Sequence, residues 1–135
     1  MKITVDTNIL VRLVMGDDPS QNRIAVETVE GASLVAISVY SLCELAWVLD
    51  RRYAIARSEI ARAIRGLIEP SNVAINRPAV EAGLAVLDAG GDFADGVIAY
   101  DGNWLGGETF VSFDKRAVTL VAKQGLQARR PGVGN

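Results

Sequence analysis

Five acidic side chains from four separate segments are the residues best suited to chemistry in this sequence. They are Asp6, Glu44, Asp92, Asp95 and Asp114. Two carboxylates about 4 Å apart repel each other by roughly 4 kcal/mol at an effective dielectric near 20, so a cluster of them stays ionised only with compensation. Mg²⁺ and Mn²⁺ prefer oxygen ligands and supply it. Such ions activate water and neutralise a phosphodiester in the transition state, which predicts phosphodiester hydrolysis.

The composition excludes several other kinds of chemistry. The 135 residues include no histidine, and Cys43 is the single cysteine. Ser-His-Asp and Cys-His catalysis, histidine-containing zinc sites and intramolecular disulfides are therefore absent, and the cysteine usage fits a reducing cytoplasm. The net charge of −2 means that any binding of nucleic acid would have to be local. No targeting signal and no apolar stretch of about 20 residues is visible, so no membrane association is expected.

Short β-branched runs alternate with amphipathic segments along the chain. The expected strands are residues 2–5, 34–37, 73–75, 109–112 and 126–128, and the expected helices are residues 6–15, 20–30, 39–51, 57–68, 78–87, 95–104 and 115–123. This alternation predicts an α/β fold, a three-layer α/β/α sandwich around a short-stranded, mainly parallel central sheet. We expect one domain over residues 1–128 and a flexible C-terminal tail over residues 129–135, which is rich in glycine and proline.

The expected strands place the acids at one edge of the sheet. Asp6 directly follows the first strand, Asp114 follows the fourth, and Glu44 lies in the helix after the second. Ligands of parallel α/β sheets bind beyond the carboxyl ends of the strands. If the sheet is parallel, all five carboxylates should gather there.

Each acid also has a structural interpretation. Asp6, Asp92, Asp95 and Asp114 stand at expected helix starts, where aspartate is a preferred N-cap. Ser41 and Glu44 have the spacing of a capping box, although the apolar pattern suggests that the helix begins a little earlier. Tyr40 and Trp47 are helical neighbours of Glu44 and leave it no broad solvated side. Glu44 is therefore expected to be partly buried, which would require a cation.

Basic residues accompany the acids in two places, and aromatic residues lie near them. Arg51 and Arg52 follow the helix of Glu44, and Lys115 and Arg116 follow Asp114. They could guide a phosphate backbone towards the acids, or they could be ordinary solvated helix faces, because acids are interspersed among them. Trp47, Tyr53 and Trp104 could stack on bases, or pack in the core or an oligomer contact.

Four motifs in this order resemble a known family. They are Val5-Asp6-Thr7-Asn8-Ile9-Leu10 after the first strand, Glu44 in an apolar helix, Asp92-Phe93-Ala94-Asp95 before Val97-Ile98-Ala99, and Phe113-Asp114 after a strand. Together they resemble the PIN domain over about residues 1–128. The small single-domain form is similar to VapC-type toxins of bacterial toxin–antitoxin pairs.

The resemblance implies a Mg²⁺- or Mn²⁺-dependent endoribonuclease toxin with a flavodoxin-like, PIN-like fold. It also implies an RNA substrate, a cognate antitoxin, a homodimer and a cytoplasmic location. The catalytic and metal-binding set carried over is Asp6, Glu44, Asp95 and Asp114, with Asp92 as an accessory metal ligand. Thr7 and Asn8 would order the site. Ser112 stands where many members have threonine, and it keeps the hydroxyl.

Two other classes of function remain open at this point. A receiver domain that accepts phosphate on an aspartate would share the sheet type and an acidic Mg²⁺ pocket. It would require paired acids after the first strand, where Asp6-Thr7-Asn8 offers one. A degenerate PIN domain that binds without catalysis is the other possibility, and the full set of acids argues against it. A phosphatase that opens with Asp-x-Asp fits less well, because position 8 is asparagine.

Overall fold

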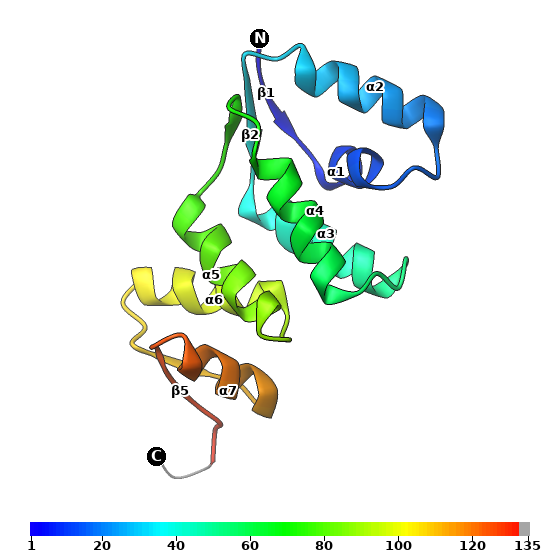
Figure 1. The fold of residues 1–135 in the computed structure, drawn as a ribbon. Coiled ribbons are helices and arrows are strands. Elements are labelled where there is room, and N and C mark those ends of the chain that lie inside the picture. The colour runs from blue at the N-terminus through cyan, green and yellow to red at the C-terminus, as the bar shows by residue number, and fades with distance from the viewer. Residues whose placement is uncertain (133–135) are drawn as a thin grey trace. The chain divides into compact units, whose positions relative to one another are not determined.

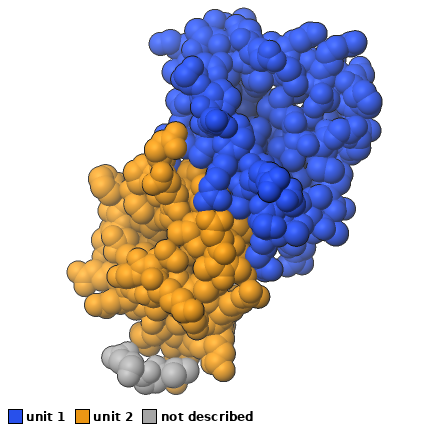
Figure 2. All heavy atoms as spheres, in the orientation of Figure 1, with its two compact units in different colours: residues 1–76 blue, residues 77–135 orange. Residues whose placement is uncertain are grey.

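The computed structural model describes residues 1–132, which form seven helices and five short strands (Figure 1). The chain divides into two compact units, Met1–Asn76 and the residues from Arg77 onward (Figure 2). Of the expected tail, residues 133–135 lie outside the described part, and Arg129 belongs to a strand. None of the helices in residues 1–132 is long and apolar enough to cross a membrane.

The first unit holds a three-stranded parallel sheet and four helices. Its elements are β1 (Lys2–Val5), α1 (Thr7–Val14), α2 (Pro19–Glu30), β2 (Leu34–Ile37), α3 (Val39–Arg51), α4 (Arg57–Ile68) and β3 (Val73–Ala74). The strand order is β1-β2-β3. In the register of the first pair, Val5 lies opposite Ile37. The carboxyl ends of β1 and β2 are therefore level, and the segments that follow them start side by side.

The second unit holds a two-stranded parallel sheet and three helices. Its elements are α5 (Arg77–Asp88), α6 (Phe93–Trp104), β4 (Thr109–Val111), α7 (Lys115–Lys123) and β5 (Gln127–Arg129). β4 pairs with β5, with Thr109 opposite Gln127. The α/β class and the parallel pairing are confirmed. The described strands pair in two sheets, however, whereas one central sheet was expected.

Local signals explain most helix ends. Pro19 occupies the first turn of α2, where its missing N–H costs nothing, and Gly31 ends that helix. Ser38 is the N-cap of α3 and accepts a hydrogen bond from the Tyr40 amide at 3.1 Å. The proposed capping box of Ser41 and Glu44 is thus wrong, because the N-cap is Ser38, three residues before Ser41. In α2 the apolar pattern predicts that Ile24 and Ala25 both point inward; Ala25 is buried, but Ile24 is 56% exposed.

Close packing of α5 against α6 requires a glycine. A Cβ on Gly96 would overlap the carbonyl oxygen of Ala82 and lie 2.9 Å from the Cα of Gly83. Glycine inside a helix costs about 1 kcal/mol relative to alanine. The close approach to the α5 backbone offsets that cost at Gly96. By contrast, a Cβ on Gly102 of the same helix would meet nothing within 4 Å.

We expect Gly96→Ala to destabilise the protein and Gly102→Ala to stabilise it or leave it unchanged. Because the obstacle at Gly96 is backbone rather than a flexible side chain, α5 and α6 must move apart, at a cost of about 3 kcal/mol. At Gly102 the gain in helix propensity is up to about 1 kcal/mol. Urea unfolding of the two variants measures the difference. Equal free energies of unfolding would show that α5 and α6 do not pack closely in solution.

Candidate active site

Asp6 lies at the junction between β1 and α1. Val5 is buried and ends the strand, and the extended backbone of Asp6 then begins the helix as its N-cap. One side-chain oxygen, Oδ1, accepts a hydrogen bond from the Ile9 amide at 3.1 Å. The side chain is exposed, and its Oδ2 accepts no hydrogen bond from a described residue. Asp6 therefore caps a helix with one oxygen and leaves the other available to a ligand.

Glu44 lies on α3, in the same unit as Asp6. The hydroxyl of Thr7 donates a hydrogen bond to Glu44 Oε1 at 3.1 Å. This bond connects the first residue of α1 to α3, and it orients Glu44 as the ordering role of Thr7 would require. Asn8 is exposed, and its ordering role stays a prediction.

The prediction that Glu44 is partly buried is wrong, because Glu44 is exposed. Its helical neighbours Tyr40 and Trp47 are themselves 82% and 56% exposed. The large neighbours of Glu44 predict from the sequence that its helix face is buried. The buried residues of α3 are instead Leu42, Leu45, Ala46 and Leu49, which lie on another face. Glu44 consequently needs no cation to balance burial, although it remains free to bind one.

The second unit carries the other three acids around the starts of α6 and α7. Asp92 is the N-cap residue of α6 by position, and Asp95 lies in the first turn rather than at the cap, because the helix starts at Phe93. Asp114 is the N-cap of α7, and its Oδ1 accepts hydrogen bonds from the amides of Arg116 and Ala117 at 2.9 and 3.1 Å. Asp92 and Asp114 thus fit the cap positions expected for them, and Asp95 does not.

The surroundings of Asp95 shift its pKa. Partial burial raises its pKa above the ordinary value, and the negative charges of Asp92 and Asp114 raise it further. Like charges raise a carboxyl pKa when they lie close enough to repel its ionised form. The three acids of this unit therefore form one electrostatic group. A bound cation would relieve their repulsion and favour the ionised form of Asp95.

Ser112 orders the loop between β4 and α7. Its Oγ accepts a hydrogen bond from the Asp114 amide at 3.0 Å. With the two amides held by Asp114 Oδ1, this contact fixes the turn that presents the carboxylate. The expected ordering role of the hydroxyl at position 112 therefore has a structural basis within this unit.

The acids of each unit carry the oxygen donors that a hard divalent cation prefers. Among residues 1–132, however, no three Cys, Asp or Glu side chains converge closely enough to hold a metal ion. The first unit offers Asp6 and Glu44, and the second offers Asp92, Asp95 and Asp114. Mg²⁺ needs only one or two protein carboxylates because it keeps several waters. The donors present fit that mode of binding.

The basic residues named above lie on the surface of their units. The exposed guanidinium of Arg51 pairs with Asp50 at 3.5 Å, and Arg52 is the exposed C-cap of α3. Lys115 and Arg116 are exposed in the first turn of α7. The Arg116 guanidinium also reaches the turn before Asp92, because a Cβ on Gly90 would lie 2.8 Å from its Nη2.

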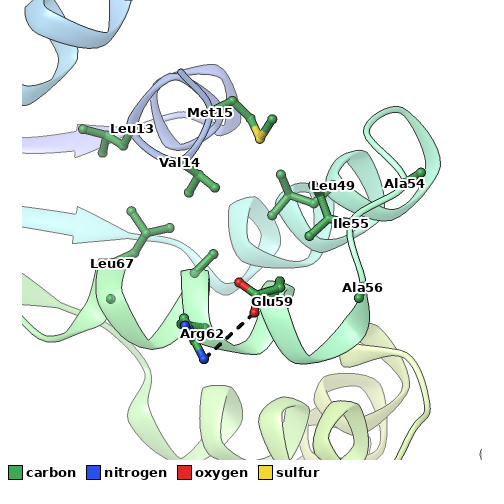
Figure 3. Close-up of a pocket in the computed structure, with 12 residues that line it drawn as sticks. Leu13, Val14, Met15, Leu49, Ala54, Ile55, Ala56, Glu59, Arg62 and Leu67 are labelled. Carbon is green, nitrogen blue, oxygen red and sulfur yellow. Dashed lines mark ion pairs between the residues drawn. The ribbon is translucent and has the colours of Figure 1, made fainter. Parts of the chain in front are cut away.

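An apolar pocket of about 640 Å³ lies within the first unit. Figure 3 shows the end of α1 facing the end of α3 and the length of α4 across it, with the Glu59–Arg62 ion pair at its rim. Its lining residues are Leu13, Val14, Met15, Leu49, Ala54, Ile55, Ala56, Glu59, Arg62, Ala63, Gly66 and Leu67. The pocket is separate from the acids, and its apolar lining suits another side chain or helix.

Sequence reasoning missed a polar network in the first unit, which joins Arg12, Asp17 and Tyr53. Arg12 pairs with Asp17 at 2.9 Å, and the Tyr53 hydroxyl donates to Asp17 at 2.9 Å and accepts from Arg12 at 3.3 Å. Tyr53 was considered for stacking on bases, but its hydroxyl serves this network. Residues 36 and 41 positions apart are joined here, and no local pattern indicates such pairs.

Comparison with known proteins identifies the family. The PIN domain model matches residues 3–122, which is most of the chain. No curated protein matches the sequence. PIN domains are generally nucleases, so the match assigns hydrolase chemistry at this coarse level. The acids at the start of α1, on α3 and at the starts of α6 and α7 all lie within the matched range, and the chain belongs to the PIN domain family.

Proposed function

We propose that the protein is a Mg²⁺- or Mn²⁺-dependent endoribonuclease that hydrolyses RNA phosphodiester bonds. The observation that carries this proposal is the group of three acids at the starts of α6 and α7, where partial burial raises the pKa of Asp95 and the charges of Asp92 and Asp114 raise it further. Carboxylates arranged in this way destabilise the folded protein unless a cation binds to them. No observation favours the receiver domain or the non-catalytic module over this function.

The residues have distinct roles in the proposal. Asp6 and Asp95 would each serve as a metal ligand, Asp6 through its Oδ2 because Oδ1 caps α1. Glu44, oriented by Thr7, directs the attacking water. Asp114 uses Oδ1 for the α7 cap, so its other oxygen serves a second ion or the surrounding water, and Asp92 assists as an accessory ligand. When bound, the cation supplies an activated water and stabilises charge on the phosphodiester.

Incubation of the purified protein with single-stranded RNA tests this proposal. We expect cleavage in Mg²⁺ or Mn²⁺, loss of cleavage in EDTA, and recovery when excess cation is restored. Sequencing the new RNA 5′ ends would identify the cleavage sites. Cleavage that persists at full rate in EDTA would reject the metal-dependent mechanism.

We further propose that this nuclease is a VapC-type toxin that acts in the cytoplasm as a homodimer and is held by a cognate antitoxin. The apolar pocket between α1, α3 and α4 suits an amphipathic antitoxin helix, which binds through apolar anchors on one face. Leu49 of α3 and Leu67 of α4 supply apolar lining for such anchors.

Expression of the protein in a bacterial host tests the toxin role. Induction should arrest growth, and co-expression of a short neighbouring reading frame that encodes a DNA-binding protein should relieve the arrest. The substitution Gly66→Trp would fill the pocket and should weaken that relief without changing cleavage by the purified protein. Normal growth on induction of an active nuclease would contradict the toxin role.

A further inference from the structure

We propose that the exposed face of α3 holds single-stranded RNA, with Tyr40 and Trp47 stacking nucleobases on either side of Glu44. The α3 strip is defined here as Tyr40, Glu44, Trp47 and Arg51. The inference rests on the proposed nuclease function and deepens it, because it names the residues that position the substrate. Tyr40 and Trp47 are substrate-positioning residues and take no part in bond breaking.

Helical spacing places the α3 strip on one face. Its residues are separated by four, three and four positions, and side chains three or four residues apart are neighbours on a helix surface. The buried residues of α3, which include Leu42, Leu45 and Leu49, face the core of the unit instead. The strip therefore contributes nothing to that core, and its two aromatic rings are open to a ligand.

Both aromatic rings of the α3 strip are exposed to solvent. Tyr40 is 82% exposed and Trp47 is 56% exposed. Large aromatic side chains are the most favourable ones to bury, and exposed groups of them mark binding surfaces. Every nucleobase offers a flat face that stacks on such rings, so a ring on each side of a nuclease carboxylate suits RNA regardless of sequence.

The spacing of Tyr40 and Trp47 along the helix favours an RNA strand whose bases are unstacked. Tyr40 and Trp47 are seven residues apart, or about 10.5 Å along the helix axis. Stacked neighbouring bases are separated by only about 3.4 Å, so the rings lie roughly three base steps apart. A duplex keeps its bases inside the stack and cannot offer them to either ring. A single strand can splay two bases outward and leave the phosphodiester between them opposite Glu44.

The charges along the α3 strip also fit a nucleic acid. Arg51 is exposed beyond Trp47, and its 3.5 Å contact with Asp50 lies on the surface, where ion pairs contribute little. Its guanidinium can therefore exchange that partner for a phosphate. The strip alternates ring, acid, ring and cation. This alternation lacks the continuous apolar surface that a partner helix would need.

The hydrogen bond from Thr7 gives the strip a fixed relation to the chemistry. It holds Glu44 Oε1 at 3.1 Å from the first residue of α1, directly after Asp6. The position of Glu44 between the rings is thus set by two elements of the same unit. Bases held at Tyr40 and Trp47 would bring the intervening phosphate to the end of β1, where Asp6 lies.

Tryptophan fluorescence measures the proposed stacking directly. The chain has two tryptophans, so Trp104→Phe leaves Trp47 as the single reporter. Titration of this variant with oligouridylate in EDTA should quench the Trp47 emission, whereas a matched RNA duplex should leave it unchanged. Absence of quenching by saturating single-stranded RNA would overturn the inference.

Kinetics separate positioning from catalysis. Tyr40→Ala and Trp47→Ala should each raise KM for single-stranded RNA roughly tenfold to a hundredfold, the loss of one stacked base, with kcat changed little. Trp47→Phe should restore part of the affinity. Ile24→Ala, which removes a large apolar side chain as exposed as Trp47 from α2 of the same unit, is the matched control and should leave KM unchanged. Unchanged KM in both strip variants would overturn the inference.

Two outcomes distinguish this inference from the function on which it rests. If the wild-type protein cleaves RNA but the strip variants bind and cleave it normally, the proposed role of the α3 strip is wrong and the nuclease function stands. If the wild-type protein cleaves no RNA, the nuclease function fails, and with it this inference. A change of oligomeric mass on Trp47→Ala without a change in KM would assign the strip to a protein interface and overturn it.

Discussion

Asp95→Asn is expected to abolish RNA cleavage and to make the protein more stable at neutral pH. Loss of one charged group that acts on the transition state lowers kcat on the order of 10³-fold. The same substitution removes the charge that burial and the neighbouring Asp92 and Asp114 disfavour. Catalytic need and stability therefore oppose each other at this position, as they commonly do in active sites.

The pH dependence of this stability follows from the direction of the pKa shift. The pKa of Asp95 is higher in the folded protein than the ordinary value of 3.8, so between the two values the folded state binds more protons than the unfolded state. The contribution of Asp95 to stability then decreases as the pH rises through that window. The gain in the free energy of unfolding on Asp95→Asn should consequently grow as the pH rises through that window, and shrink in acid.

Chemical unfolding across the acid-to-neutral range, without divalent cation, measures this effect. Asp101→Asn is the matched control, because Asp101 is an exposed carboxylate on the same helix and should give no comparable gain. If Asp95→Asn is no more stable than the wild type at neutral pH, the carboxylates of the second unit do not form a repulsive group.

Asp6→Asn is expected to lower kcat by a similar factor with little change in stability. Asparagine is as good an N-cap as aspartate, so the bond to the Ile9 amide can persist while the charge is lost. Asp18→Asn is the matched control, since Asp18 caps α2 through the Gln21 amide at 3.0 Å in the same way. That variant should cleave RNA at the wild-type rate.

The double variant Asp6→Asn, Asp95→Asn shows whether the two carboxylates act in one step. Groups that act as a unit are strongly non-additive, and removal of a second group then costs little more. We expect kcat of the double variant to lie no more than about tenfold below kcat of the slower single variant. A loss equal to the product of the two single losses would assign the two residues to independent processes.

Helix bounds were the most predictable part of the fold. Helices α3, α4 and α7 span the predicted residues 39–51, 57–68 and 115–123, because apolar periodicity defines all three and a side-chain N-cap marks the start of α3 and of α7. Strand bounds were off by a residue at β3, β4 and β5. The pairing of the strands in two sheets was not predicted. Strands of two to four residues carry too little pattern to specify their neighbours.

The candidate site was predictable in its residues but not in its environment. Motif spacing placed Asp6 and Asp114 at helix starts, as found. Burial of Glu44 was inferred from aromatic neighbours that prove to be exposed, since sequence does not distinguish a core ring from a binding ring. The bond from Thr7 to Glu44 spans 37 residues, and it depends on the pairing of β1 with β2.

The central claim is that Asp6 and Asp95 are metal ligands of the proposed nuclease. Calorimetric titration of Mn²⁺ into the wild-type protein, Asp6→Asn and Asp95→Asn tests it most directly. We expect Mn²⁺ to bind the wild type and each single variant to bind it at least tenfold more weakly, because each substitution removes an oxygen ligand. Wild-type affinity for Mn²⁺ in either variant would contradict the claim.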